Sequence, residues 1–132
     1  MKTLIAEDDY TSRRLLERIL SAYGQCDIAV DGTEAIRAVE TALADQYPYD
    51  LICMDVMMPN VDGNEALEKI RALERRAGIP GARETKVIMI TALGDPKSVV
   101  KSLYKAGATV YVVKPVAKRA LLEELRRLGL IE

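Results

Sequence analysis

The chain alternates between two hydrophobic periods. Short apolar runs bounded by charge, glycine or proline are typical of buried β-strands, and they occupy residues 4–6, 26–30, 51–54, 87–90 and 109–113. Between these runs, and after the last one, apolar residues recur every three or four positions, as on one face of a helix. The pattern therefore predicts five strands and five helices in alternation.

Most of the predicted helices have recognisable ends. Their starts are Asp9 as N-cap, the turn at residues 31–33, Gly63, and Asp95 with Pro96 at the first helical position. Their stops are Gly24, Pro48, the segment 78–81 and Gly107. The apolar face of the first helix is expected to consist of Leu15, Leu16, Ile19, Leu20 and Tyr23.

Alternating strands and helices build a parallel sheet with helices on both faces, because each crossover returns the chain to the same end of the sheet. We therefore expect a doubly wound α/β fold. A chain of 132 residues fits one domain that buries roughly two thirds of its unfolded surface. The long connection at residues 75–86 is expected at the end of the sheet opposite the strand carboxyl ends.

Composition narrows the possible functions. Histidine is absent, which excludes imidazole catalysis and zinc sites of the histidine type. Cys26 and Cys53 form no CxxC pair and lie in predicted strands, so we expect core residues in a reducing compartment. Acidic residues follow closely on the N-terminus and no apolar run reaches membrane-spanning length. We therefore expect a soluble, cytoplasmic protein without membrane insertion.

Charge is distributed unevenly along the chain. The net charge is −1, but residues 95–132 hold eight Lys/Arg against four Asp/Glu, a local +4 that leaves −5 for residues 1–94. This excess is too small to indicate direct nucleic-acid binding. Solvated basic faces on the last two helices explain it, and a dedicated binding surface is the alternative.

Chemically distinctive residues fall where the strands end. The first strand is followed by Glu7, Asp8 and Asp9, and other strands end at Asp55, Thr91 and Lys114. Each has an ordinary explanation: an acid that caps a turn or helix, a threonine that favours strands, a lysine at the surface. In open α/β sheets, however, ligands bind outside the carboxyl ends of the strands. We therefore expect these side chains to converge on one patch.

Converging carboxylates repel one another unless a cation relieves the repulsion. The candidate ligands are Glu7, Asp8, Asp55 and the backbone carbonyl of Met57; all are oxygens, which favours Mg²⁺ with positions left open for water or phosphate oxygens. A carboxylate beside Mg²⁺ can attack phosphorus and form an aspartyl phosphate. Asp55 is the central candidate. Lys114 would pair with one phosphoryl oxygen, and the Thr91 hydroxyl would donate to another.

In order and over essentially the whole chain, these residues resemble the receiver domains of two-component response regulators, the CheY-like family. The matching segments are residues 4–9, 50–63, 90–92, 106–108 and 111–115. The resemblance implies a five-stranded sheet in the order 2-1-3-4-5 and Mg²⁺-dependent phosphorylation of Asp55 by the phosphohistidine of a sensor histidine kinase or phosphotransfer protein. It implies a signalling switch that catalyses its own phosphorylation and dephosphorylation, rather than an enzyme in the usual sense. It also allows a cis bond between Lys114 and Pro115.

The resemblance further implies a conformational switch. Tyr111 matches the aromatic residue that turns inward when the Thr91 hydroxyl moves onto the phosphoryl group; from the residues alone, an amphipathic tyrosine on an edge strand is an equal interpretation. Phosphorylation would change the face of the fourth helix, fifth strand and fifth helix, where a downstream protein binds. Basic residues on that face predict an acidic partner surface: Lys97, Lys101, Lys105, Lys118, Arg119, Arg126 and Arg127.

Two more expectations concern lifetime and domain organisation. Met57 follows Asp55 by two positions and Leu93 follows Thr91 by two, and neither side chain can position an attacking water, so we expect slow self-dephosphorylation. The chain ends soon after the last predicted helix. We therefore expect one receiver domain over residues 1–132, no output domain, and regulation through another protein.

Three alternative functions remain open. A phosphatase of the haloacid-dehalogenase kind also uses an aspartate nucleophile, but it needs a second acid two positions later, where this chain has Met57. A flavodoxin-like FMN protein needs a phosphate-binding loop after the first strand, where Glu7, Asp8 and Asp9 would repel phosphate. A degenerate receiver that serves only as a scaffold is the third, although every expected site residue is present. Ester turnover and bound flavin colour would distinguish the first two.

Overall fold

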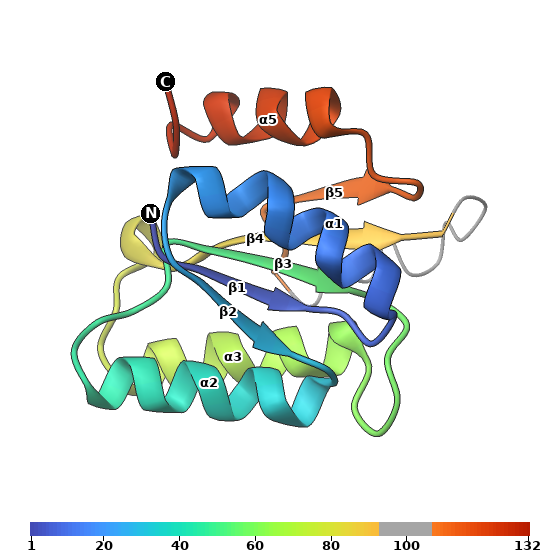
Figure 1. The fold of residues 1–132 in the computed structure, drawn as a ribbon. Helices are drawn as coiled ribbons and strands as arrows, with labels where there is room; N and C mark the ends of the chain where they lie inside the picture. The colour runs from blue at the N-terminus through green and yellow to red at the C-terminus, as the bar shows by residue number, and fades with distance from the viewer. Residues whose placement is uncertain (93–106) are drawn as a thin grey trace.

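The structure, a computed structural model, describes residues 1–92 and 107–132. Five parallel strands form one sheet in the order β2-β1-β3-β4-β5 (Figure 1). The strands are β1 (Thr3–Ala6), β2 (Cys26–Ala29), β3 (Leu51–Asp55), β4 (Lys86–Thr91) and β5 (Val110–Val113). The expected doubly wound α/β fold and its strand order are confirmed.

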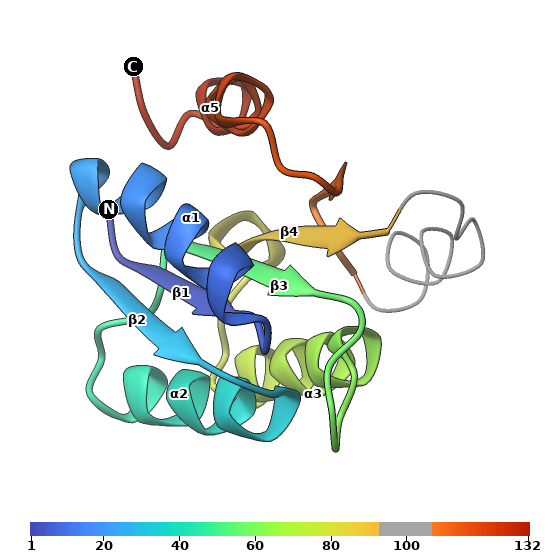
Figure 2. The same cartoon turned by 45° about the vertical axis from the view of Figure 1, so that its right-hand side comes forward.

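Helices cover both faces of the sheet. On one face lie α1 (Tyr10–Leu20) and α5 (Lys118–Arg127), and on the other lie α2 (Gly32–Ala44) and α3 (Gly63–Arg76), as Figure 1 and Figure 2 show. Two short 3-10 turns, η1 (Ser21–Tyr23) and η2 (Gly81–Arg83), complete the described elements. The helix predicted from Asp95 lies outside the described residues. No helix within the described ranges is long and apolar enough to cross a bilayer.

The sheet separates two apolar clusters. Leu4, Ile52 and Met54 face α2 and α3, whereas Ile5 and Cys53 face α1 and α5. Successive strand residues point to opposite faces, so a sheet covered on both sides needs apolar residues at every position. This requirement explains the uninterrupted apolar runs at residues 4–6, 51–54 and 87–90, which lie in the three inner strands.

Three helices begin at aspartate caps. Asp9, Asp31 and Asp62 each accept a hydrogen bond from the backbone N–H three residues later, at 2.8, 2.8 and 2.9 Å. At the third start, a Cβ on Gly63 would clash with the carbonyl oxygen of Asp55. Glycine therefore lets α3 begin directly against the end of β3, which fixes the position of Asp55.

Several predicted boundaries need correction. α1 ends at Leu20, and a 3-10 turn follows before Gly24. α2 ends at Ala44, ahead of Pro48, because Gln46 adopts a left-handed conformation with φ of 55°. β2 stops at Ala29 and β5 starts at Val110, each one residue shorter than predicted.

Two side chains are less buried than predicted. Cys26 lies on the edge strand β2 and is half-buried, whereas Cys53 on the central β3 is fully buried. Leu15 is 42% exposed, while its neighbour Leu16 is 1% exposed. Adjacent residues on a helix point about 100° apart, and Leu15 lies at the edge of the apolar face that Leu16, Ile19 and Leu20 direct toward the sheet.

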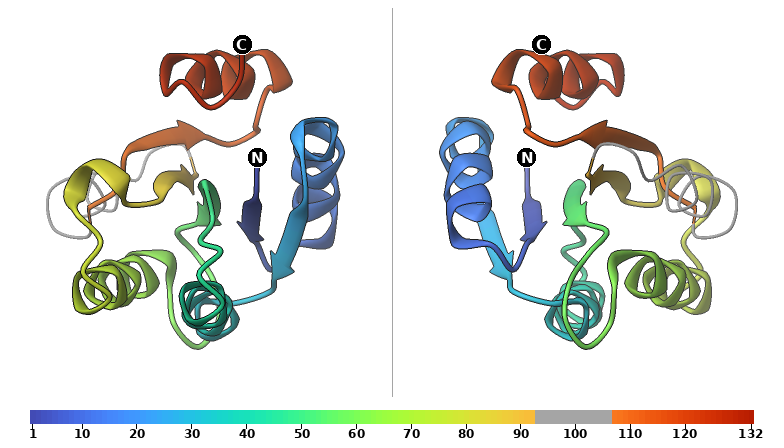
Figure 3. Two further views of the ribbon diagram at one scale, coloured as in Figure 1. Left: turned by 90° about the vertical axis from the view of Figure 1, so that its left-hand side faces the viewer. Right: turned by 90° about the vertical axis from the view of Figure 1, so that its right-hand side faces the viewer.

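All five strands run in the same direction, so their carboxyl ends share one edge of the sheet. The right-hand view in Figure 3 looks onto that edge. The connection that contains η2 lies at the opposite edge, as predicted (Figure 1).

Candidate functional site

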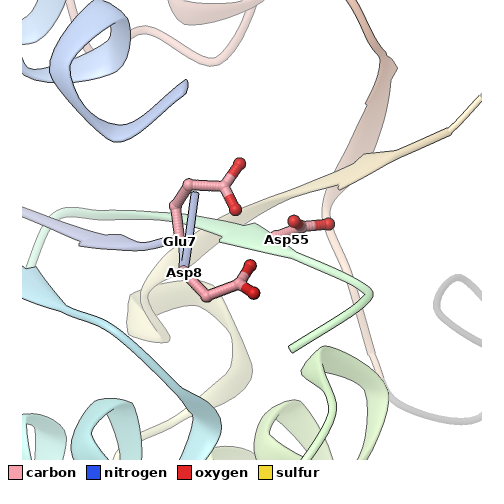
Figure 4. Close-up of side chains that lie close together, drawn as sticks. All are labelled: Glu7, Asp8 and Asp55. Carbon is pink, nitrogen blue, oxygen red and sulfur yellow. The ribbon is translucent and has the colours of Figure 1, made fainter. Parts of the chain in front are cut away.

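Three carboxylates converge at the carboxyl edge of the sheet. Ligand oxygens of Glu7, Asp8 and Asp55 all lie within 4.8 Å of one another. Figure 4 shows the carboxylates of Glu7 and Asp8 extending toward Asp55. Glu7 is 0% exposed and Asp55 is 4% exposed, whereas Asp8 is exposed. The site is thus a buried acidic pair with a third acid at the solvent boundary.

The loop after β1 holds Glu7 and Asp8 in place. Arg13 on α1 donates from Nη1 to the carbonyl oxygens of Glu7 at 3.0 Å and Asp8 at 3.4 Å. The next acid, Asp9, caps α1, and the hydrogen bond from Ser12 holds the pKa of Asp9 below its ordinary value. Asp9 therefore shapes the loop and does not join the carboxylate cluster.

Lys114 completes the cluster from the end of β5. Its Nζ lies 2.9 Å from Asp55 Oδ2 and 3.0 Å from Glu7 Oε1. Its backbone N–H donates to the Thr91 carbonyl at 2.8 Å, and its bond to Pro115 is cis, as the sequence allowed. Burial alone would lower the pKa of Lys114, but hydrogen bonds and charge from Asp55 and Glu7 outweigh burial and raise it.

The cluster carries more negative charge than its single ammonium can neutralise. Burial, and then the hydrogen bond with Asp55, raise the pKa of Glu7 to about 8. Although Lys114 Nζ lies close to Glu7 Oε1, that oxygen is buried without a hydrogen bond of good geometry. A divalent cation with oxygen ligands would relieve this repulsion, so the residues present fit such an ion.

The remaining predicted residues surround Asp55. The Met57 N–H donates to Asp55 Oδ1 at 3.1 Å, while the Met57 side chain is 66% exposed. Thr91 ends the neighbouring strand β4; it is 2% exposed, and its hydroxyl makes a long hydrogen bond of 3.4 Å to the Ala92 carbonyl. Tyr111 is 38% exposed on the edge strand β5. Leu93 lies outside the described residues.

Sequence reasoning missed two features next to the site. The first is Arg13, whose guanidinium supports the acidic loop. The second is an apolar groove of about 430 Å³ between α1 and residues 115–116, which reaches Glu7 and Lys114. No sequence signal marks the groove, because Leu15 and Leu16 form an adjacent apolar pair just as Ile19 and Leu20 do, yet of these four only Leu15 is exposed.

The basic surface of α5 is partly neutralised. Lys118, Arg119, Arg126 and Arg127 are all exposed. Arg119 lies 3.4 Å from Glu123, and Arg127 lies 3.3 Å from Glu124. The predicted lysines of the fourth helix lie outside the described residues.

Comparison with known proteins places the chain in a family. The response regulator receiver domain matches residues 3–126. The chain is 35% identical over 126 residues to the chemotaxis protein CheY of Treponema pallidum. The matched region covers 94% of this chain and 79% of that protein. The chain spans about half the length of other relatives, among them the probable transcriptional regulators ycf29 of Porphyra purpurea and ycf27 of Cyanophora paradoxa.

Solved structures agree with this placement. The receiver domain of Ssk1, in complex with the histidine phosphotransfer protein Ypd1 of Saccharomyces cerevisiae, matches with a TM-score of 0.82 and 27% identity, covering 98% of this chain and 88% of that one. CheY of Borrelia burgdorferi, in complex with CheX, BeF3 and Mg²⁺, matches with a TM-score of 0.81 and 26% identity, covering 100% and 90%. The fold, the acidic strand ends and these matches together show that the chain belongs to the response regulator receiver domain family.

Proposed function

We propose that this domain accepts a phosphoryl group on Asp55 from the phosphohistidine of a sensor histidine kinase or a phosphotransfer protein. The observation that carries the proposal is the meeting of Asp55, Glu7 and Asp8 within 4.8 Å, with Lys114 Nζ 2.9 Å from Asp55. This arrangement combines a nucleophilic carboxylate, oxygen ligands for a cation, and a fixed ammonium.

Mg²⁺ is the cation that this ligand set suits. Glu7, Asp8, Asp55 and the Met57 carbonyl would hold it, and it supplies positive charge that neutralises the oxygens of the transferred group. Asp55 supplies the attacking oxygen. Lys114 Nζ already donates a hydrogen bond to Asp55 Oδ2, so it needs only a small movement to reach a phosphoryl oxygen on that carboxylate. The Thr91 hydroxyl makes only a long hydrogen bond, 3.4 Å, to the Ala92 carbonyl. This hydroxyl can therefore rotate toward the phosphoryl group.

Phosphorylation would then act as a switch rather than as catalytic turnover. A phosphoryl group adds roughly one to two negative charges at one point. The Thr91 hydroxyl would move toward it, and Tyr111, now 38% exposed, would turn inward. A downstream protein with an acidic surface would bind the face of the fourth helix, β5 and α5. The Ypd1 complex of a related receiver supports a phosphotransfer protein as the donor, and the complex with Mg²⁺ and BeF3 supports the cation.

A phosphodonor assay tests this function directly. The purified chain is incubated with Mg²⁺ and acetyl phosphate, and its intact mass is measured. We expect one added phosphoryl group, which is lost in Asp55→Asn and when a chelator removes Mg²⁺. Asp45→Asn, which changes an exposed aspartate at the end of α2, is the matched control and should be labelled normally. Full labelling of Asp55→Asn would contradict the proposal, and steady hydrolysis of simple phosphate esters would favour a phosphatase.

A further inference from the structure

The apolar groove beside the site has no role in the function proposed so far. It measures about 430 Å³, which is within the range of small-molecule sites. Leu15 and Leu16 of α1 line it together with Pro115 and Val116, and it extends to Glu7 and Lys114. A groove with apolar walls and a few polar groups at one end is the usual form of a site for a small amphipathic ligand.

The charged end of the groove is the reactive end of the domain. Lys114 lines the groove, and its Nζ lies 2.9 Å from Asp55 Oδ2. A ligand with an anionic phosphoryl head at Lys114 would therefore have that head next to Asp55, with its apolar part along α1. Leu15, which is 42% exposed, would be covered by such a ligand. Charge and polarity thus match a small phosphodonor that has an apolar leaving group.

We propose that the groove binds the acyl chain of small acyl phosphates, so that donors with a longer apolar acyl group phosphorylate the domain faster than acetyl phosphate does. This inference rests on the proposed function of Asp55. In the reaction, a carboxylate oxygen of Asp55 forms a bond to phosphorus. The bond between phosphorus and the acyl oxygen breaks, and the acyl group leaves as a carboxylate with the bonding electron pair. One acyl phosphate and one carboxylate are consumed and one of each is formed, so no oxidant and no net proton are needed.

The experiment compares acetyl phosphate with butyryl phosphate. Both are used at the same low concentration with Mg²⁺, and the initial rate of phosphoryl addition is followed by intact mass. Each methylene that leaves water for the groove should increase the rate about fourfold. Butyryl phosphate carries two more methylenes than acetyl phosphate, so we expect it to react about fifteenfold faster when their burial is nearly complete.

Three variants assign the preference to the groove. Leu15→Asn places a polar group in the wall and should bring the ratio of butyryl to acetyl rates close to one. Thr11→Leu, at an exposed position of the same groove, should raise the ratio. Ile28→Asn is the matched control, because Ile28 is 38% exposed but lies on β2, outside the groove, and its ratio should equal that of the unchanged chain. Taking the ratio within each variant cancels differences in folding, and comparing the ratios between variants cancels the difference in intrinsic donor reactivity.

The outcomes separate this inference from the function on which it rests. Equal rates with both donors, alongside normal labelling of Asp55 by acetyl phosphate, would overturn the groove and leave the proposed function intact. A butyryl preference that survives in Leu15→Asn would also overturn it. If Leu15→Asn slows transfer from a phosphorylated phosphotransfer protein while both acyl phosphates react equally, the groove binds protein and the inference is wrong. Failure of every donor to label Asp55 would overturn both.

Discussion

Two buried ionic clusters lie at opposite ends of the sheet within residues 1–92 and 107–132, and their charges are neutralised to different degrees. At the carboxyl edge, Glu7, Asp8 and Asp55 share one ammonium, that of Lys114. At the amino ends of β4 and β5, Arg71 and Glu74 of α3 form an ion pair of 2.7 Å; these two residues are 5% and 2% exposed. The first cluster has an excess of negative charge, whereas the buried pair of the second is neutral, with the partly exposed Glu84 4.0 Å from Arg71 at its margin.

Hydrogen bonding sharpens the contrast. Both oxygens of Glu74 are used, one by Arg71 and the other by the Thr85 N–H at 2.8 Å. Arg71 donates to the Thr85 carbonyl at 2.8 Å and to the Gly107 carbonyl from both Nε and Nη2, at 3.1 and 3.0 Å. In the acidic cluster, by contrast, Glu7 Oε1 is buried without a well-aligned hydrogen bond.

This difference in charge balance separates buried charges that stabilise the fold from buried charges that bind a ligand. A neutral, fully hydrogen-bonded cluster stays buried without any ligand, and here it ties α3 to the starts of two strands. A cluster with unbalanced charge and a strongly shifted pKa lowers stability by itself, which is expected where a ligand must bind.

The largest effect is expected from Arg71→Met. This change leaves the Glu74 carboxylate buried without its partner, which should lower the free energy of unfolding by about 3–5 kcal/mol. Urea denaturation measures the loss. The control is Arg14→Met in the exposed ion pair between Arg14 and Glu17, where we expect a loss of about 0.5 kcal/mol or less. A loss in Arg71→Met no larger than in the control would remove the contrast between the clusters.

The acidic cluster should make the Mg²⁺-free domain less stable as pH rises. Below about pH 4.5 Glu7 is protonated in both states, but above it the unfolded chain loses this proton while the folded chain keeps it up to a pKa of about 8. Stability from Glu7 is therefore present at low pH and lost as pH rises through about 8. We expect a fall of about 1 kcal/mol per pH unit in this window, measured by denaturation with a chelator present. The same slope in Glu7→Gln would show that another group is responsible.

Mg²⁺ should stabilise one cluster and leave the other unchanged. At a Mg²⁺ concentration about 100 times its Kd, the free energy of unfolding should rise by about 2.7 kcal/mol. The rise should disappear in Asp55→Asn. In Arg71→Met it should persist within about 0.5 kcal/mol, because distant sites contribute additively. An increment that vanishes in both variants would mean that the two clusters are coupled.

The smallest effect concerns Met57 and Leu93, which follow Asp55 and Thr91 by two positions in the sequence. We propose that Met57, which is 66% exposed, and Leu93 shield the phosphoryl group without positioning water. Polar residues at both positions should speed the loss of phosphate by about tenfold, equal to about 1.4 kcal/mol of barrier. The decay of the phosphorylated mass after donor removal measures this rate. Unchanged decay would refute the shielding role.

The sequence predicted the acidic cluster well because its signals are local. Each residue follows an apolar run, and parallel strands bring those positions to one edge. The neutral cluster was missed because its partners Arg71, Thr85 and Gly107 are far apart in sequence. A hint was present, since Arg71 and Glu74 continue the helical spacing of Leu67 and Ile70 on the buried face of α3. An ionic pair at core positions of a helix indicates buried partners elsewhere.

Other details depend on packing that the sequence does not encode locally. The exposure of Leu15 follows from the placement of α1 on the sheet, and the groove exists only because residues 115–116 return beside that helix. Tyr111 was equally compatible with a switch and with an ordinary edge residue, and its half-exposed position on β5 fits both. Its switch role stays a prediction.

Chemical mapping of the phosphorylated residue tests the central claim most directly. Borohydride reduces an aspartyl phosphate to homoserine, so peptide mass spectrometry after treatment with Mg²⁺, acetyl phosphate and borohydride identifies the modified position. We expect homoserine at position 55 and only when Mg²⁺ is present. Homoserine at another position, or equal modification of Asp55 without Mg²⁺, would contradict the account.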